Sequence, residues 1–187
     1  ETLKSGDPVF MCGITKVIGN NHTAAQAAVE EARRQDFHAL LITTCLQGEA
    51  REAGRIIATI AQQIERTGQP VERPCCIVLG GETTVTVQGE GKGGRNTELA
   101  LGAVEAMAGL RDCMLITLAT DGGDGPTDAA GAVVTGETRA LAEKAGLMPS
   151  EFLSRNDSYS FFERLQDLLL TGPTRTNVND LVFLFAF

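Results

Sequence analysis

The chain has 187 residues, 43% of them hydrophobic, and a formal net charge of −8, so it can bury one core or two small ones. Its 16 basic residues are scattered instead of clustered, which argues against nucleic acid as a partner. No apolar run reaches the roughly 20 residues that span a bilayer, and no secretory signal pattern opens the chain, so we expect a soluble cytoplasmic protein without membrane contact.

The first third of the chain alternates strand and helix patterns. Residues 16–19 read as the end of a strand, and Thr23 begins a helix in which Gln26 completes a capping box. Residues 39–43 are continuously apolar, which is typical of a buried parallel strand. From residue 48 to about 66, apolar side chains recur every three or four positions, which predicts a helix with one buried face.

A glycine helix stop and two prolines at residues 67–74 predict a domain boundary. We therefore expect two domains, residues 1–70 and residues 75–187. Residues 75–79 predict a buried strand, and the alternating Thr and Val of residues 83–87 predict a second strand that forms a hairpin with the first.

The remaining elements continue the alternation. The pattern predicts a helix that ends near residue 107, a strand at 114–119, helices that begin near residues 138 and 158, and a closing strand at 181–187. Strands that alternate with helices predict the α/β class, with helices layered on a sheet.

Four cysteines lie inside or beside apolar runs, which predicts buried, reduced thiols. They are Cys45, Cys75, Cys76 and Cys113. The adjacent pair at 75 and 76 lacks the two-residue spacer of a zinc site, which argues against structural zinc.

A glycine-rich loop precedes the helix that begins near residue 95. Its residues include Gly89, Gly91, Gly93, Gly94, Arg95 and Asn96. Backbone N–H groups and the positive end of a helix can hold an anion there, and Arg95 adds a fork for phosphate or carboxylate. The spacing also matches the Gly-x-Gly-x-x-Gly of dinucleotide sites, and a flexible turn is a third interpretation.

A second polar loop follows the strand at 114–119, where open α/β sheets place ligand groups. It contains Thr120, Asp121, Asp124, Thr127 and Asp128. Its carboxylates can coordinate Mg²⁺ or take a proton from a substrate hydroxyl, and equally each can cap a turn. Asn177 and Asn179, before the closing strand, suit either a ligand pocket wall or a turn.

Five stretches occur in the order of the motifs of one known domain. They are residues 80–83, 89–98, 120–131, 156–162 and 172–180. The chain resembles the MOFRL family, which forms the C-terminal part of glycerate 2-kinases, proteins also named hydroxypyruvate reductases. Residues 1–70 are similar to the end of the Rossmann-like N-terminal domain of that family. The resemblance implies a layered α/β/α MOFRL-like domain preceded by the βαβα end of a Rossmann-like domain.

The same resemblance implies ATP- and Mg²⁺-dependent phosphorylation of D-glycerate in a cleft between two domains, with most of the N-terminal domain outside this chain. We assign catalytic roles to Arg95 and Asp121, with Asp121 also as the metal ligand. The other residues of the two loops, with Asn177 and Asn179, are assigned to phosphate and substrate binding.

Two alternatives stay open, an NAD(P)H-dependent hydroxypyruvate reductase and a non-catalytic ligand-binding or regulatory module. We expect the chain alone to be inactive. The exposed apolar edge of residues 1–70 is expected to pair with a second copy of the chain, giving a homodimer, or to be covered by a fragment of the missing domain.

Overall fold

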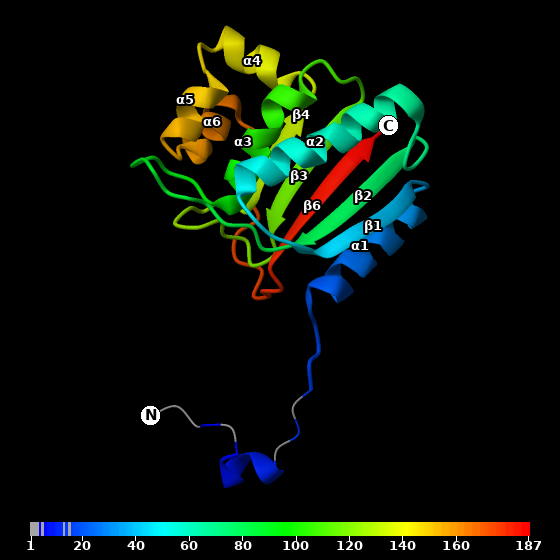
Figure 1. Ribbon diagram of the computed structural model, residues 1–187, viewed down its shortest axis with the longest axis vertical. Helices are drawn as coiled ribbons and strands as arrows, with labels where there is room; N and C mark the ends of the chain where they lie inside the picture. Colours follow the sequence, from blue (N-terminus) through cyan, green and yellow to red (C-terminus); the bar gives the residue numbers. More distant parts are fainter. Residues whose placement is uncertain (1–3, 5, 13, 15) are drawn as a thin grey trace.

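A computed structural model describes residues 4, 6–12, 14 and 16–187 (Figure 1). In chain order the elements are η1 (Pro8–Cys12), α1 (Asn21–Arg34), β1 (His38–Leu46), α2 (Ala50–Thr67), β2 (Cys75–Gly81), α3 (Arg95–Met107), β3 (Cys113–Ala119), β4 (Gly131–Thr135), α4 (Thr138–Lys144), α5 (Pro149–Ser154), α6 (Ser158–Leu165), β5 (Leu168–Leu169) and β6 (Asp180–Ala186).

One six-stranded sheet forms the centre of the fold, in the order β1-β2-β6-β3-β4-β5. β1 and β2 are parallel, whereas β6 runs antiparallel to its neighbours β2 and β3. The first residue of β6, Asp180, pairs with Gly81 at the end of β2 and with Ala119 at the end of β3. The loops that follow β2 and β3 therefore leave the sheet beside the loop that enters β6.

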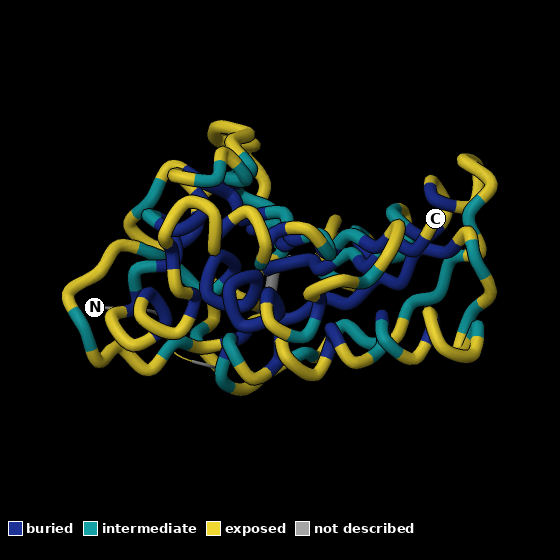
Figure 2. Tube along the Cα trace, turned by 90° about the horizontal axis from the view of Figure 1, so that it is seen from above, coloured by how far each residue is buried: buried dark blue, intermediate teal, exposed yellow. Residues whose placement is uncertain are grey.

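Helices cover both faces of the sheet, which confirms the predicted α/β class (Figures 1 and 2). On one face, Val29 of α1 packs in a cluster with Val78 of β2. On the other face, Ile57 of α2 and Leu99 of α3 share a larger core with Leu184 of β6. Figure 2 shows the buried residues in dark blue, running through the interior of the molecule.

The helix predicted at residues 48–66 is confirmed as α2, and its apolar stripe is buried. The helix ends at Thr67, and Gly68 is its C-cap. Gly68 has a left-handed φ of 69°, and its N–H donates to the Ile64 oxygen at 2.9 Å. Two further glycines allow α2 to pack close to α3. A Cβ on Gly54 would lie 2.0 Å from the Leu99 oxygen, and one on Gly102 would lie 2.3 Å from the Arg51 oxygen.

The predicted boundary at residues 67–74 is the connection from α2 to β2, and the strands on its two sides, β1 and β2, are neighbours in the same sheet. β1 and α2, which precede the connection, contribute to the same core as β2 and α3. The structure therefore places residues 38–67 in one layered unit with residues 75–187. That residues 1–70 continue a Rossmann-like domain stays a prediction.

The N-terminal expectations were wrong in two details. Residues 16–19 form no strand, and the side chains of Val17 and Ile18 are exposed, 73% and 91% respectively. The edge of the sheet on this side is β1, and residues 16–19 do not pair with it. The cap of α1 is Asn20, whose side-chain oxygen accepts a 2.8 Å hydrogen bond from the Thr23 nitrogen. Thr23 thus lies inside the helix instead of starting it.

The hairpin predicted for residues 75–79 and 83–87 was also wrong. Both edges of β2 are already occupied, by β1 and by β6, so that no edge is open to a returning strand. Residues 83–87 run instead beside the start of α2, where Thr84 exchanges backbone hydrogen bonds with Gly48 and Ala50. This path makes residues 82–87 one wall of a cavity that is described below.

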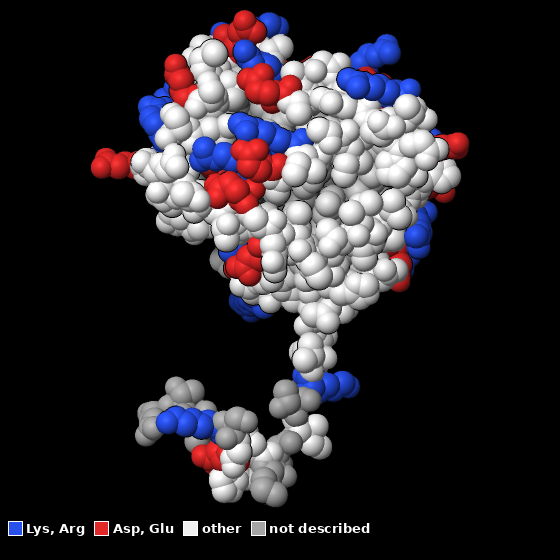
Figure 3. Space-filling view, viewed as in Figure 1, with Lys and Arg blue, Asp and Glu red and all other residues white. Residues whose placement is uncertain are grey.

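Cys75, Cys76 and Cys113 are buried free thiols, as predicted, whereas Cys45 is exposed on the edge strand β1. Among the described residues, no three His, Cys, Asp or Glu side chains are grouped as a metal site would require. No helix within the described part of the chain is both long and apolar enough to cross a bilayer. On the face drawn in Figure 3, acidic and basic side chains are intermingled.

Candidate active site

A cavity of about 840 Å³ opens beside the start of α3. Its walls are residues 82–87, the glycine loop that ends at Gly94, and the first turn of α3 with Arg95 and Glu98. Gly125 of the aspartate loop and Asn156, between α5 and α6, also line the cavity. The cavity thus joins segments that are far apart in the sequence.

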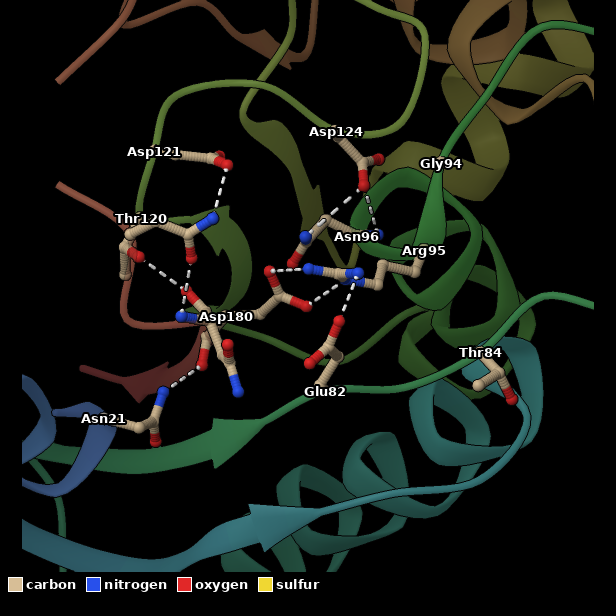
Figure 4. Close-up of polar contacts among 12 residues, drawn as sticks. Asn21, Glu82, Thr84, Gly94, Arg95, Asn96, Thr120, Asp121, Asp124 and Asp180 are labelled. Carbon is tan, nitrogen blue, oxygen red and sulfur yellow. Dashed lines mark hydrogen bonds and ion pairs between the residues drawn. The ribbon is translucent and has the colours of Figure 1, made fainter. Parts of the chain in front are cut away.

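Arg95, the first residue of α3, is held by two carboxylates (Figure 4). Its Nε donates to Asp180 Oδ2 at 2.5 Å and one terminal nitrogen donates to Asp180 Oδ1 at 3.3 Å. The other terminal nitrogen donates to Glu82 Oε1 at 2.8 Å. Burial lowers the pKa of Arg95, but the hydrogen bond with Asp180 and the charges of Asp180, Glu82 and Asp124 together raise it. Arg95 is therefore a fixed cation at the cavity wall.

The N-terminal turn of α3 is already bound to a carboxylate, that of the buried Asp124 (Figure 4). Asp124 Oδ1 accepts from the Asn96 nitrogen at 2.9 Å, and Oδ2 accepts from the Thr97 nitrogen at 2.8 Å. Burial raises the pKa of Asp124, and these hydrogen bonds oppose that rise. The expectation that the helix end and Asn96 bind an external phosphate through these N–H groups is therefore wrong, because the protein supplies its own anion there.

The glycine loop lies against the turn between α5 and α6, which accepts hydrogen bonds from the nitrogens of Gly89, Gly91 and Lys92. Asn156 Oδ1 accepts from the Gly89 nitrogen at 3.0 Å, and the Arg155 oxygen accepts from the Gly91 nitrogen at 2.9 Å. A Cβ at either glycine would lie within 2.5 Å of the Arg155 oxygen, so only glycine permits this approach.

The N–H groups of the other two loop glycines, Gly93 and Gly94, do not bind this turn. The Gly94 nitrogen donates to Thr97 Oγ1 at 3.0 Å. Within the described residues, the Gly93 N–H makes no hydrogen bond, and Gly93 lines the cavity. The anion site predicted for four loop glycines is thereby reduced to Gly93 and the neighbouring guanidinium.

Asp121, Thr120, Asn177 and Asn179 form one cluster where β3 ends and β6 begins (Figure 4). Asp121 Oδ2 accepts from Asn177 Nδ2 at 3.0 Å, and Thr120 Oγ1 donates to the Asn179 oxygen at 2.6 Å. The structure thus brings these four predicted residues together, and Asp121 remains partly exposed.

The three aspartates of the loop do not converge, so they do not together form a set of ligands for one metal ion. Asp121 faces Asn177, Asp124 points inward to α3, and Asp128 accepts a 2.8 Å hydrogen bond from the Tyr159 hydroxyl. That hydrogen bond lowers the pKa of Asp128 and raises the pKa of Tyr159 to about 12. Thr127 Oγ1 donates to the Asp124 backbone oxygen at 2.8 Å and stabilises the turn.

Sequence reasoning assigned no role to five residues that lie at or beside the site, which are Glu82, Asp180, Glu98, Asn156 and Asn21. Asn21 Nδ2 donates to the backbone oxygens of Val178 and Asp180 at 2.8 and 2.9 Å, and so fixes the loop that enters β6. Glu82 and Asp180 lie in the motif stretches 80–83 and 172–180, and this was the one signal that could have identified them. Glu98 and Asn156 lie in the motif stretches 89–98 and 156–162, but Glu98 is on a helix, where a carboxylate usually indicates a solvent-facing position.

The sequence of this chain is similar to a known protein family and to several known proteins. A family model described as the MOFRL family matches residues 75–180. The D-glycerate 2-kinase of Thermotoga maritima is 46% identical over 166 residues, which cover 89% of this chain and 40% of that protein. A protein of Agrobacterium vitis, provisionally named a hydroxypyruvate reductase, is 40% identical over 97% of this chain and 41% of its own length.

A solved structure shows the same fold. The crystal structure of a glycerate kinase from Thermotoga maritima superposes with a TM-score of 0.91 and 44% sequence identity. The match covers 92% of this chain and 42% of that one. The chain therefore spans about two fifths of the length of the relatives that it matches.

Proposed function

The chain belongs to the MOFRL family, and on that premise we propose that it forms part of the active site of a glycerate 2-kinase. Such an enzyme transfers the terminal phosphoryl group of ATP to a hydroxyl of D-glycerate. The remaining part of the site is proposed to lie in the region that the longer relatives have in addition. The substrate and the nucleotide are then the small-molecule partners, and a cytoplasmic location and a homodimer stay predictions.

The observation that carries the proposal is that the Arg95 guanidinium lines the cavity and keeps hydrogen-bond donors for a ligand. A guanidinium has five N–H donors. In Arg95, three of these donors form hydrogen bonds with Asp180 and Glu82. Two donors remain on a side chain that is 34% exposed, next to the unpaired Gly93 N–H. These donors suit the carboxylate of glycerate or a phosphate oxygen, because a fixed cation loses little freedom when an anion binds.

Asp121 is proposed to act at the reacting hydroxyl. The hydroxyl oxygen attacks the terminal phosphorus, the bond from that phosphorus to ADP breaks, and the hydroxyl proton passes to a base. Asp121 is a partly exposed carboxylate that Asn177 orients, and it is proposed either as this base or as a metal ligand. Positioning and neutralisation of charge supply most of the rate in such reactions.

Mg²⁺ is proposed to arrive with the nucleotide. In phosphoryl-transfer sites it is usually held by one or two carboxylates together with the substrate phosphates. Asp124 is buried and binds the first turn of α3 through both oxygens, and Asp128 lies against Tyr159. We propose that Asp121 shares this ion, because it is partly exposed and, among the described residues, accepts only one hydrogen bond on each oxygen, from the Gly123 nitrogen at 3.2 Å and from Asn177 Nδ2 at 3.0 Å. The donor set therefore fits an ion that is shared with ATP and does not fit a cage made of the three aspartates.

The reductase alternative receives less support from the geometry. A dinucleotide loop places a pyrophosphate on the first-turn N–H groups of the following helix. In this chain Asp124 binds those groups, so a pyrophosphate would have to displace a buried carboxylate. The glycines of the Gly-x-Gly-x-x-Gly spacing serve other contacts: Gly89 and Gly91 lie against the α5–α6 turn, and Gly94 lies against Asp124.

The test uses a chimera in which this chain replaces the matching residues of the Thermotoga maritima enzyme, assayed beside that enzyme and beside the 187-residue chain alone. We expect the chimera to release ADP when D-glycerate and Mg²⁺ are present, without NADH. We expect the chain alone to show no turnover, because a cleft enzyme needs groups from both walls at one substrate.

Three outcomes would contradict the proposal. Oxidation of NADH by hydroxypyruvate without release of ADP would make the reductase the better assignment. A folded chimera that catalyses neither reaction would favour a non-catalytic module. Turnover by the chain alone at a rate near that of the chimera would place the whole catalytic apparatus within these 187 residues.

A further inference from the structure

An ion pair between Glu98, which lines the cavity, and Arg51 is not used by the proposed chemistry. Glu98 of α3 is 1% exposed, and its Oε1 accepts a hydrogen bond from a terminal nitrogen of Arg51 on α2. Burial raises the pKa of Glu98, and the charge and hydrogen bond of Arg51 oppose that rise. A carboxylate in this position carries an unfavourable desolvation free energy, which an apolar residue would avoid.

Arg51 is itself committed to this position. The same terminal nitrogen donates to the Leu153 oxygen of α5 at 3.0 Å, and the buried Nε makes no hydrogen bond. The pair therefore joins α2, α3 and α5, at the level where Gly54 and Gly102 let α2 approach α3.

Asn156 connects this pair to the glycine loop. Its Nδ2 donates to Glu98 Oε1 at 3.3 Å, while its Oδ1 accepts from the nitrogens of Gln88 and Gly89 at 2.7 and 3.0 Å. The residue is buried and has a φ of 53°, a left-handed conformation that asparagine tolerates better than most residues. Glu98 and Asn156 both line the cavity, so a shift of either changes its wall.

We propose that Glu98 and Arg51 are positioning residues, which orient the Asn156 amide and thereby hold the start of the glycine loop in the conformation that binds substrate. The pair acts on the loop through one side chain and does not touch the reacting atoms. This inference deepens the proposed kinase function, and its kinetic consequence rests on that function.

A purely structural role would predict a different result. If the pair only holds α2 on α3, its loss would loosen the whole core, with no special effect on the loop. If it orients Asn156, its loss would release the amides of Gln88 and Gly89 while β2 and β6 stay protected. The two cases therefore differ in where the protein loosens.

Amide hydrogen exchange of the ¹⁵N-labelled 187-residue chain, resolved by NMR, separates these cases without any activity. Asn156→Gly removes the acceptor directly and suits the left-handed φ, and we expect the Gln88 and Gly89 amides to exchange at least about tenfold faster. Glu98→Gln should change the same two amides in the same direction by a smaller factor. Arg51→Lys is the second variant, should Glu98→Gln fail to fold.

Glu105→Gln is the matched control, because Glu105 also lies on α3 and also pairs with an arginine of another helix, Arg139, at 2.9 Å. It should leave the loop amides unchanged. Loop amides that stay protected in Glu98→Gln while Asn156→Gly releases them would overturn the proposal. So would faster exchange spread evenly over the core of Glu98→Gln.

The kinetic arm uses the active chimera. Glu98→Gln should raise the KM for D-glycerate at least about fivefold and change kcat by less than about twofold, because the site binds less well but its chemistry is intact. Arg51→Lys should give a smaller effect. A chimera without kinase activity would contradict the proposed function alone, since the exchange measurement on the chain would still decide the positioning role.

Discussion

Asp124 Oδ2 lies 2.8 Å from the backbone nitrogen of Thr97 and 2.9 Å from its hydroxyl oxygen. This contact ties the aspartate loop after β3 to the first turn of α3, and it satisfies N–H groups that a helix leaves unpaired at its start. A carboxylate of the protein thus occupies the position in which the glycine-rich sequence predicts an external anion.

Asp124→Ala should lower the free energy of unfolding by about 2–4 kcal/mol, because a helix cap is lost and buried donors are left unpaired. Urea unfolding followed by circular dichroism measures this change. Asp128→Ala is the matched control from the same loop, and its exposed side chain should cost less than about 1 kcal/mol. Equal losses for the two variants would show that the Asp124 contact has no special weight.

Arg95→Lys in the chimera should lower kcat/KM for D-glycerate at least about tenfold, because lysine keeps the charge but cannot bind Asp180 and an anion with one planar fork. Steady-state assays at fixed Mg²⁺ and ATP measure the ratio. Arg139→Lys, on α4, is the control and should retain the parental rate. A rate within about twofold of the parent for Arg95→Lys would reduce Arg95 to a structural partner of Asp180 and Glu82.

Asp121→Asn separates the two roles proposed for this carboxylate. If Asp121 is the base, kcat should fall by about 10²-fold or more while the Mg²⁺ requirement stays unchanged. If it is a metal ligand, the Mg²⁺ concentration at half-maximal rate should rise. Mg²⁺ titrations at saturating ATP distinguish these results, and a variant that is unchanged in both would remove Asp121 from the site.

Burial should make Cys76 unreactive while the protein is folded. Desolvation raises the pKa of its thiol to about 12, whereas Cys45 is exposed. Iodoacetamide labelling at pH 8, located by mass spectrometry, should modify Cys45 and leave Cys76 unmodified until urea is added. Equal labelling of both cysteines in the native protein would contradict the buried position of β2.

The same pKa predicts a loss of stability at alkaline pH. The thiol form favours the folded state, so its contribution is complete below the pKa of an unfolded cysteine, about 8.5, and is lost as the pH rises toward about 12. Urea unfolding between pH 7 and pH 10 should therefore show a smaller decline for Cys76→Ala than for the parent chain. Parallel declines would assign the alkaline loss to other groups.

Much of the fold follows from local patterns. The spacing of Ile57, Ala61 and Ile64 is sufficient to predict α2, and the continuous apolar run at 75–79 predicts β2. Local patterns do not specify which strands pair when they are far apart in the sequence. The insertion of β6 between β2 and β3 could not be predicted, and it is the reason that residues 83–87 find no strand partner.

In the site too, local sequence patterns were informative, whereas contacts between distant segments were not predicted. Glycine and aspartate density indicated the correct loops, and the cluster of Asp121 with Asn177 formed as a group. The partners of each charge depend on the folded structure, so that neither the carboxylates around Arg95 nor the burial of Glu98 could be predicted from spacing. The motif order therefore identified the family better than it identified the contacts.

The most direct test of the account is a crystal structure of the chimera with D-glycerate and a non-hydrolysable ATP analogue. The account predicts an anionic group of a ligand within hydrogen-bond distance of the Arg95 guanidinium and the Gly93 N–H, in the cavity between residues 82–87 and the start of α3. Ligand density elsewhere, with Arg95 bound to Asp180 and Glu82 alone and the cavity empty, would contradict it.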